Sequence, residues 1–387
     1  MFYCGIDVAK RSHQVTVIDE DKKVVLASRK IDNDRAGFDQ LIGDLSPYQG
    51  RLQIGLEATG HYWLPLYETL TQQGFAVSVI NPLQVHAYSK LDMRRRKTDK
   101  KDAYCIADFV RFANPEPTRD NLPSLLQMRE LSRFRFRLVQ QISDNKRRII
   151  AVLDRVFPEY ERLFSDVFLK SSRRLLQEAV TPDELAEFDL SELSALLSSA
   201  SRGHFGMAKA EEIRAAASRS VGVSFLADAV QIEIRCLLEQ IALLETQCKE
   251  VEERLAQLME EMSQHIMTIP GIKLVTGAAI LSEIGDIKRF ASIEKLVAFA
   301  GIDPSVYQTG EFEGTKSHMS KRGSPYLRYY LWLAANSSRQ SDTEMRAYYE
   351  KKRAEGKPHN VVMGALCRKL LARIFIILKE DRPYIKR

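Results

Sequence analysis

The sequence predicts an α/β domain followed by all-α segments, and three observations support this fold class. Short β-rich runs alternate with helical patterns before residue 115. The pattern becomes wholly helical from Leu125 to Phe157. Between Ile234 and Met262, apolar residues recur at alternating intervals of three and four. A chain of 387 residues has room for two or three such domains.

The first domain should begin with three antiparallel strands and continue with alternating helices and strands. The residue patterns indicate strands at 2–8, 14–19, 23–27, 52–56 and 76–80, and helices at 35–45 and 62–73. A sheet of this kind is mixed and carries helices on its faces. The order β-β-β-α-β-α-β-α matches the ribonuclease-H-like arrangement, and we assign residues 1–120 to this α/β domain.

The helical part should consist of a linker, residues 121–264, and a C-terminal unit, residues 265–387. The linker's clearest signal is the heptad stripe over 232–262. It predicts either one long helix packed on its own domain or an antiparallel or intersubunit coiled coil. We favour the coiled coil, because a narrow seam suits a single partner helix. Residues 158–225 indicate only short helices.

Composition excludes several classes of protein. The hydrophobic fraction of 45% and the charged fraction of 28% are globular averages and exclude a disordered or fibrous chain. Five scattered cysteines without a CxxC pair exclude a disulfide framework and favour a reduced, cytoplasmic protein. Neither a signal peptide nor an apolar run of the ~20 residues that a membrane span needs is present, so we expect no membrane partner.

Four acidic residues stand out in the first domain. Asp7 and Glu57 each end an apolar strand, where a buried carboxylate is costly unless it meets a cation. Asp99 and Asp102 share one face of a helix start. Taken singly, each is explained as a cap, a paired core acid or a solvated residue. Together they predict a site for two divalent ions that stabilise the attacking and leaving oxygens of a phosphoryl transfer.

A basic run lies beside these acids. Seven Lys/Arg accompany three acids between Lys90 and Asp102. Such a run is commonly a solvated face, but next to metal-binding acids it suits the phosphates of a nucleic acid. A second basic stretch, from Arg129 to Arg155, has eight Lys/Arg against three acids. The candidate contacts in the first run are Lys90, Arg94, Arg95, Arg96, Lys97, Lys100 and Lys101.

Two segments of the C-terminal unit suggest further phosphate contacts. Residues 270–273 resemble a helix-hairpin-helix turn, in which backbone N–H groups hold a phosphate, although Lys273 replaces the usual second glycine. Residues 301–310 and 317–324 are rich in hydroxyls, glycine and cations, a composition that also suits a plain surface loop. The candidate contacts here are Gly271, Lys273, Lys321 and Arg322.

Seven motifs occur in order along the chain, and together they carry a family resemblance. They resemble those of insertion-sequence transposases with a RuvC-like DEDD domain, which are related to Piv-type DNA invertases and include the bridge-RNA-guided recombinases. The resemblance covers roughly residues 1–115 and 265–380. The motifs are Gly5-Ile6-Asp7-Val8-Ala9-Lys10, Leu56-Glu57-Ala58-Thr59-Gly60, Val79-Ile80-Asn81-Pro82, Lys97-Thr98-Asp99-Lys100-Lys101-Asp102-Ala103, Ile269-Pro270-Gly271-Ile272, Phe299-Ala300-Gly301 and Met319-Ser320-Lys321-Arg322-Gly323.

The resemblance implies a nucleophilic serine in the C-terminal transposase domain, which attacks a DNA phosphate to give a covalent intermediate. At that position this sequence has Thr309, which keeps the hydroxyl but adds a crowding β-methyl group. We favour Thr309 as the nucleophile; the alternatives are that Ser305 serves instead or that strand transfer is impaired. The resemblance also implies double-stranded donor and target DNA, a structured guide (bridge) RNA, and a Mg²⁺-binding catalytic tetrad made of Asp7, Glu57, Asp99 and Asp102.

These observations lead to the hypothesis of a DNA recombinase that excises and inserts a mobile element. In it, the coiled coil joins two copies and two dimers form a tetramer around two DNA sites. The main alternative is a metal-only RuvC-like nuclease or Holliday-junction resolvase that uses water. An actin-like sugar kinase is disfavoured, because residues 8–10 offer no glycine-rich phosphate loop. A non-catalytic architectural protein would leave the four acids unexplained.

Overall fold

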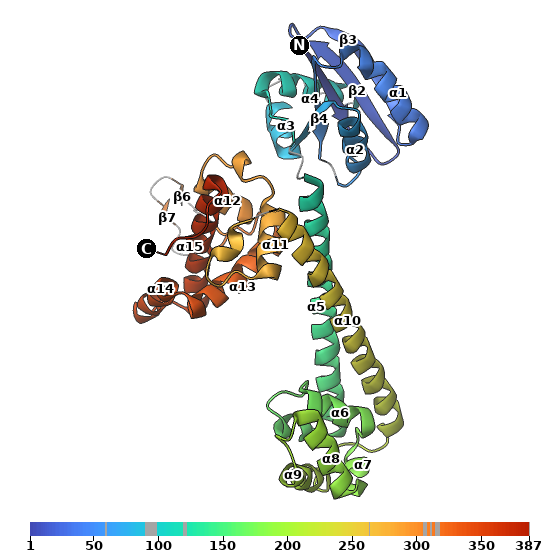
Figure 1. The fold of residues 1–387 in the computed structure, drawn as a ribbon, viewed down its shortest axis with the longest axis vertical. Helices are drawn as coiled ribbons and strands as arrows, with labels where there is room; N and C mark the ends of the chain where they lie inside the picture. The colour runs from blue at the N-terminus through green and yellow to red at the C-terminus, as the bar shows by residue number, and fades with distance from the viewer. Residues whose placement is uncertain are drawn as a thin grey trace. The chain divides into compact units, whose positions relative to one another are not determined.

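The protein folds into two compact units, Met1–Leu122 and Pro123–Arg387, each described by itself below (Figure 1). None of the helices in the described ranges is both long enough and apolar enough to cross a membrane. The computed structural model describes residues 1–58, 60–89, 99–118, 122–262, 264–304, 308–309, 312–313 and 318–386.

The first unit is a five-stranded mixed sheet with helices on both faces, as the sequence predicts. Its strands are β1 (Phe2–Asp7), β2 (Ser12–Asp19), β3 (Val24–Asp32), β4 (Leu52–Glu57) and β5 (Ala76–Ile80), in the order β3-β2-β1-β4-β5. The pairs β1–β2 and β2–β3 are antiparallel, whereas β1–β4 and β4–β5 are parallel. Its helices are α1 (Arg35–Leu45), α2 (Leu64–Gln72), α3 (Pro82–Ser89) and α4 (Asp99–Ala113).

Strand β3 is longer than the sequence pattern indicates. The expected strand ends at residue 27, but pairing with β2 continues to Ser12↔Asp32. Four of its last five residues, Ser-Arg-Lys-Ile-Asp, are polar, and β3 lies at the edge of the sheet. Charged side chains on an edge strand discourage pairing with another chain, which explains why an ordinary hydrophobic pattern misses this part of the strand.

Two glycines allow α4 to lie directly on the sheet. A Cβ atom on Gly5 of β1 would stand 2.1 Å from the carbonyl oxygen of Ala103 and 2.4 Å from the amide nitrogen of Ala107. Gly55 of β4 is the register neighbour of Gly5, and its Cβ would stand 2.4 Å from a methyl carbon of Val110. Any larger side chain would push the helix away. Both glycines therefore fix where α4 crosses the sheet.

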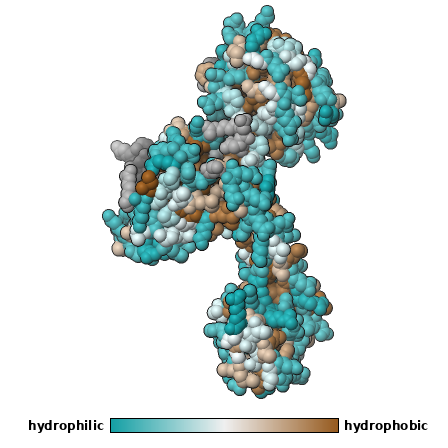
Figure 2. All heavy atoms as spheres, in the orientation of Figure 1, coloured by the Kyte–Doolittle hydropathy of each residue, from teal (hydrophilic) through white to brown (hydrophobic). Residues whose placement is uncertain are grey.

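The second unit is built on two long antiparallel helices, α5 (Leu122–Val156) and α10 (Ala227–Glu261). Three side-chain contacts join them, and the residue numbers rise along α5 as they fall along α10. The contacts are Arg135–Glu252 at 2.7 Å, Asn145–Gln240 at 3.1 Å and Arg155–Glu233 at 3.9 Å. In Figure 2 the visible face of the upper half of this pair is mostly hydrophilic. This is the arrangement expected when apolar stripes face inward.

The heptad stripe of α10 is buried inside this chain. Ile234 and Ile241 pack in one core with the C-terminal end of α5, and Leu255 and Leu258 pack in another with its N-terminal half. The stripe thus pairs with a helix of the same chain, in an antiparallel arrangement. Because these side chains are already covered, a contact between two copies would need a different surface.

Residues 157–226, whose arrangement the sequence left open, form four short helices around one end of the α5–α10 pair (Figure 1). Their core includes Tyr160, which is fully buried and whose hydroxyl lies 2.9 Å from Ser172 Oγ. Thr181 caps the second of these helices in a capping box with Glu184. The helices are α6 (Lys170–Glu178), α7 (Pro182–Glu187), α8 (Leu190–Ser201) and α9 (Met207–Ala217).

The C-terminal helices form a second core with the other half of the α5–α10 pair. Buried residues of α13 and α15 lie at its centre, among them Tyr330 and Leu370. The Tyr330 hydroxyl donates to the backbone carbonyl of Ser132 on α5 at 3.1 Å. The elements are α11 (Leu274–Ile284), α12 (Ile293–Ala300), β6 (Gln308–Thr309), β7 (Phe312–Glu313), α13 (Pro325–Ser341), α14 (Thr343–Ala354) and α15 (His359–Glu380).

Candidate active site

Asp7 and Glu57 lie at the same edge of the sheet, the one formed by the carboxyl ends of the parallel strands. They end β1 and β4, which are adjacent and parallel with Ile6 opposite Leu56. The carboxyl ends of parallel strands meet at one edge, where ligands commonly bind in open α/β sheets. Both side chains are half-buried. The two acids that the sequence singles out at strand ends are therefore neighbours in the fold.

The start of α4 reaches this same edge. The far end of the helix is fixed at the beginning of β4, where the side chain of Gln53 donates to Asn114 at 3.1 Å. The helix therefore runs opposite to β1 and β4, and its first turn lies at their carboxyl ends. Asp102 is half-buried there and directly precedes Ala103, whose carbonyl contacts Gly5. The backbone of Asp99 begins α4, but its side chain lies outside the described residues.

The donor set at this edge fits a hard divalent cation, since it consists of carboxylates from two strand ends and one helix start. Among the side chains that the structure describes, no three from His, Cys, Asp and Glu are close enough together to hold a metal ion. Asp7, Glu57 and Asp102 each also have another interaction partner. The fold thus brings Asp7, Glu57 and the start of α4 to one edge of the sheet.

The basic run beside the acids is described only in part. Lys90, Arg94, Arg95, Arg96 and Lys97 lie outside the described residues. Lys100 and Lys101 stand on the first turn of α4, next to Asp102, and their side chains are likewise not described. Their position on the chain places positive charge at the start of the helix that reaches the acid edge.

Thr309 belongs to a short hairpin, in which β6 pairs with β7 and Thr309 stands opposite Phe312. Its side chain lies outside the described residues, as does Ser305. The base of this segment is closed by an isolated bridge between Pro304 and Met319. The segment that carries the expected nucleophile is therefore held at its two ends by described structure.

Two glycines of separate motifs contact each other beneath this hairpin. A Cβ on Gly323 would stand 1.7 Å from the carbonyl oxygen of Phe299, and one on Gly301 would stand 2.7 Å from the amide nitrogen of Gly323. Gly301 also has φ +64°, a conformation that favours glycine. The Lys321 amide donates to the Gly301 carbonyl at 3.0 Å. The Phe299-Ala300-Gly301 and Lys321-Arg322-Gly323 motifs are therefore two sides of one packed support.

Side chains strengthen the same support. Arg328 donates to the carbonyl of Gly323 at 2.8 Å and to that of Ala300 at 3.3 Å. The hydroxyl of Ser320 donates to Asp303, and Arg368 reaches the Ile302 carbonyl at 3.2 Å. These bonds hold the two segments that flank the hairpin, residues 300–304 and 319–323. Lys321 and Arg322 are exposed beside them, as nucleic-acid contacts would have to be.

The Pro270–Lys273 turn differs from a helix-hairpin-helix in what precedes it and in what it touches. The element before it is a three-residue 3₁₀ turn, Ile266–Thr268, rather than a helix. Gly271 has φ +91° and lies against α13, where a Cβ would stand 2.3 Å from the Ser338 amide nitrogen. The Lys273 amide donates to Thr276 Oγ1 at 2.9 Å. The turn therefore packs α11 onto α13, and the exposed Lys273 side chain is the part that faces solvent.

Several basic side chains of the Arg129–Arg155 stretch on α5 contact other residues of the second unit. Arg133 forms a bidentate pair with Glu283 of α11, at 2.6 and 3.1 Å. This hydrogen bonding raises the pKa of the Arg133 guanidinium above its usual value. Arg129 donates twice to the Ser282 carbonyl, at 2.9 and 2.8 Å. Arg135, Arg147 and Arg155 pair with acids as well.

Sequence reasoning missed Glu283, although a signal was present. It is a single acid within an apolar helix, and it is 4% exposed. Such an acid needs a partner, and it has two, because Ser324 Oγ also donates to it at 2.8 Å. Ser324 in turn caps α13 by accepting from the Leu327 amide. This cluster joins α5, α11 and α13 directly after the Lys321-Arg322-Gly323 motif.

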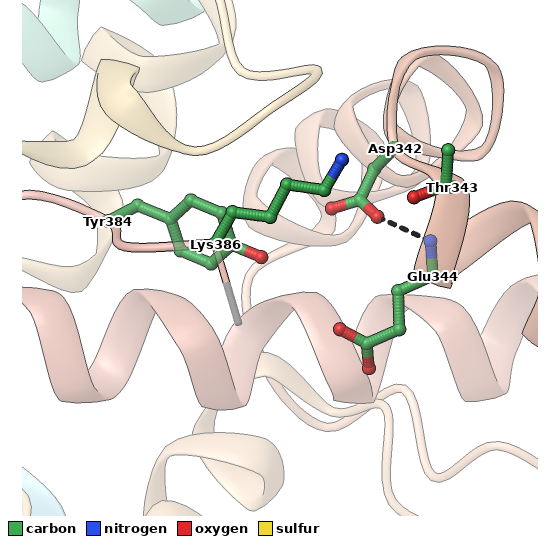
Figure 3. A pocket seen from close by; sticks show the side chains of 5 residues that line it. All are labelled: Asp342, Thr343, Glu344, Tyr384 and Lys386. Atoms are coloured by element: carbon green, nitrogen blue, oxygen red, sulfur yellow. Dashed lines mark hydrogen bonds between the residues drawn. The ribbon is translucent and has the colours of Figure 1, made fainter.

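The second unit also contains a pocket, and its carboxylates serve packing. One oxygen of Asp342 accepts from the Glu344 amide at 2.8 Å and the other pairs with Arg373 at 2.8 Å, while Glu344 pairs with Lys369 at 2.6 Å. Figure 3 shows the Lys386 side chain directed toward Asp342. The pairs fix α14 on α15. The pocket is lined by Asp342, Thr343, Glu344, Tyr384 and Lys386.

Comparison with known proteins identifies the family at both ends of the chain. Residues 4–158 match a family model of DEDD type described as a transposase, and residues 263–350 match one described as the transposase IS116/IS110/IS902 family. The chain is 26% identical to the insertion element IS900 uncharacterized 42 kDa protein of Mycobacterium paratuberculosis, over 99% of this chain and 96% of that protein.

Two further relatives carry functional names. The pilin gene-inverting protein of Moraxella bovis is 25% identical over 100% of this chain and 98% of its own length. The transposase for insertion sequence element IS1111A of Coxiella burnetii is 25% identical over 98% of this chain and 90% of its own. The two family matches and these full-length relatives agree, and the chain belongs to the IS110/IS116 family of insertion-sequence transposases, which are DNA-recombining enzymes.

Proposed function

We propose that this protein excises and inserts a mobile DNA element by metal-dependent phosphoryl transfer, through a covalent protein–DNA intermediate and with a structured guide RNA. The observation that carries the proposal is the meeting of two strand ends and one helix start at a single acid-lined edge. In this proposal residues 1–120 are a RuvC-like catalytic domain, residues 121–264 a helical linker, and residues 265–387 the domain that donates the nucleophile.

Asp7, Glu57, Asp99 and Asp102 would hold two divalent ions, and Mg²⁺ suits these carboxylates because it prefers oxygen ligands. The bound ions would supply electrostatic stabilisation to the oxygens that attack and leave the phosphorus. The chain contributes the positions of the carboxylates, which the glycine contacts of α4 determine. A one-ångström error in such positions costs about 100-fold in rate.

Thr309 would act as the nucleophile. Its Oγ1 forms a bond to a DNA phosphorus while the bond from that phosphorus to one deoxyribose oxygen breaks. The threonine proton passes to water, and the released deoxyribose oxygen takes up a proton. A deoxyribose hydroxyl of the second DNA site then attacks the same phosphorus, and the Thr309 hydroxyl is restored. The exchange conserves the number of phosphodiester bonds and needs no external energy source.

The proposed partners are donor and target DNA, a guide RNA, and further copies of this chain in a dimer that assembles to a tetramer. The guide RNA rests on the family resemblance together with the basic run from Lys90 to Lys101. Because the heptad stripe of α10 is covered by α5 in the same chain, the proposed dimer uses other surfaces.

The test is an excision assay with full-length protein and a plasmid that carries the element. Glu57→Gln should abolish excision, whereas Glu68→Gln, a matched change at an exposed position of α2, should not. Thr309→Val should abolish the protein–DNA adduct seen on a denaturing gel, and Thr309→Ser should retain it. Chelation of divalent ions should abolish excision by the parent protein.

Each contrary result has a distinct meaning. Full excision by Glu57→Gln would remove that residue from the catalytic set. An adduct formed by Thr309→Val but lost in Ser305→Ala would transfer the nucleophile role to Ser305. DNA cleavage by the parent without any adduct would favour the metal-only nuclease or junction resolvase that uses water.

A further inference from the structure

Arg289 is an ordered cation held by aromatic rings. Its guanidinium carbon lies 4.5 Å from the centre of the Phe299 ring and 4.7 Å from that of the Phe290 ring. The two rings are themselves in contact, with centres 5.2 Å apart. Phe290 is buried, so the platform is part of the core, while Arg289 remains exposed. Stacking of this kind fixes the plane of a guanidinium and leaves its N–H edge free to bind.

No ion pair within the described residues neutralises this guanidinium. Arg129 lies near enough for its positive charge to act on Arg289, while Nε and Nη2 of Arg129 donate to the Ser282 carbonyl. The Phe290 and Phe299 rings remove water from part of the guanidinium, and this partial desolvation, together with the charge of Arg129, lowers the pKa of Arg289 to about 10, against an opposing contribution from Asp286. Arg289 and Arg129 are thus two like charges in one region, with Asp286 as the acid that acts on Arg289, and an anionic ligand beside Arg289 would reduce their repulsion.

The platform is part of the support beneath the Thr309 hairpin. Phe299, which carries the Arg289 stack, contacts Gly323 through its own carbonyl oxygen. From there the chain continues through the Lys321–Gly301 hydrogen bond to the Pro304–Met319 bridge at the base of the hairpin. Arg289 is therefore linked to the nucleophile segment through its stack on the Phe299 ring and the backbone contacts that follow from Phe299.

We infer that Arg289 binds a phosphate of the substrate DNA and so positions the strand beside the Thr309 hairpin. The planar fork of an arginine matches a phosphate better than a point charge does. The inference rests on the proposed function for its choice of DNA. It adds a contact outside both basic runs of the sequence, and it assigns Phe290 and Phe299 the task of holding that contact in place.

The test measures the salt dependence of DNA binding by full-length protein in a Glu57→Gln background, so that cleavage does not interfere. Arg289→Ala should weaken binding to a duplex and lower the slope of log K against log salt by about 0.9, the value expected for one lost phosphate contact. The matched control is Arg235→Ala, which removes the same charge from the exposed, acid-rich face of α10. It should leave the slope unchanged.

Two further variants separate charge from stacking and guard against a folding defect. Arg289→Lys should keep the slope but bind more weakly, since lysine lacks the planar fork. Phe299→Leu should likewise keep the slope and weaken binding, because it keeps the charge and removes one ring.

Equal slopes for Arg289→Ala and Arg235→Ala would overturn the inference. A slope change confined to single-stranded RNA would overturn the assignment to DNA. Loss of recombination chemistry in the parent would refute the proposed function while leaving this binding result intact.

Discussion

Gly5→Ala should disrupt both the first unit and the active site, because the new methyl group meets backbone atoms rather than a movable side chain. The added Cβ would stand 2.1 Å from the Ala103 carbonyl oxygen, whereas real Cβ contacts stay beyond 3.0 Å. Helix α4 would therefore have to move by about 1 Å. Overpacking of this kind costs about 1–3 kcal/mol, and backbone on both sides of the contact puts Gly5→Ala at about 3 kcal/mol.

The measurement is urea unfolding followed by tryptophan fluorescence in a Trp332→Phe background, which leaves the buried Trp63 to report on the first unit. At a slope of about 2 kcal/mol per molar urea, the midpoint should fall by about 1.5 M. Excision should fall by about 100-fold at temperatures where the variant is folded, because Asp102 moves with α4.

Gly43→Ala is the matched control. Gly43 lies within α1, and a Cβ there meets nothing within 4 Å. This variant should gain about 0.5–1 kcal/mol from the loss of backbone freedom in the unfolded chain. If Gly5→Ala unfolds at the same urea concentration as the parent, the close packing of α4 on β1 is wrong, and with it the argument that this contact positions Asp102.

Three further predictions concern charge and packing elsewhere. Burial tends to raise the pKa of Asp108, but hydrogen bonds from Tyr88, Arg111 and Lys22 outweigh it and hold the pKa below its usual value. The contribution of the Asp108 carboxylate to the free energy of unfolding should be complete above about pH 4 and lost as the pH falls further. Asp108→Asn should lower the free energy of unfolding by about 2 kcal/mol at pH 7 and remove that acid dependence in urea titrations. Burial lowers the pKa of His13, with a smaller opposing effect of Asn33, so the unfolded chain binds the proton more readily and stability should decline as the pH drops below about 6.5. His13→Leu should flatten this decline, and an unchanged pH profile would contradict it. Gly323→Ala should destabilise the second unit by about 3 kcal/mol, since its Cβ would stand 1.7 Å from the Phe299 carbonyl, and a melting temperature equal to the parent's would refute this contact.

The positive charge of α5 illustrates where sequence reasoning falls short. Eight Lys/Arg between Arg129 and Arg155 suggest a nucleic-acid face by count alone. The structure gives several of them partners, such as Glu283 for Arg133 and Glu252 for Arg135, more than a hundred residues away. Charge that is paired across helices no longer attracts phosphates strongly. Only the tertiary contacts distinguish an ion-paired cation from one that, like Arg289, stacks on aromatic rings and forms no ion pair within the described residues.

Local sequence patterns were sufficient to predict an α/β fold for the first unit and a helical fold for the rest of the chain. Residue alternation predicted the strands of the mixed sheet, and apolar spacing predicted the long helix α10, because both depend on neighbours within a few residues. The acids at the ends of β1 and β4 were recognisable for the same reason. The pattern could not predict the full length of the edge strand β3, because most of its residues are exposed to solvent and several of them are charged rather than apolar.

The tertiary structure decided which of these residues meet. The heptad stripe left open whether the partner of α10 is a helix of another chain, and the fold supplied α5 of the same chain. Gly5 and Gly323 belong to two of the seven motifs, but the sequence does not show what they contact. In the structure they determine how closely α4 approaches β1 and how the Thr309 hairpin is supported. Contacts of this kind join residues about 20 to 100 positions apart. Their energies depend on distances of an ångström or less, and no local pattern records such distances.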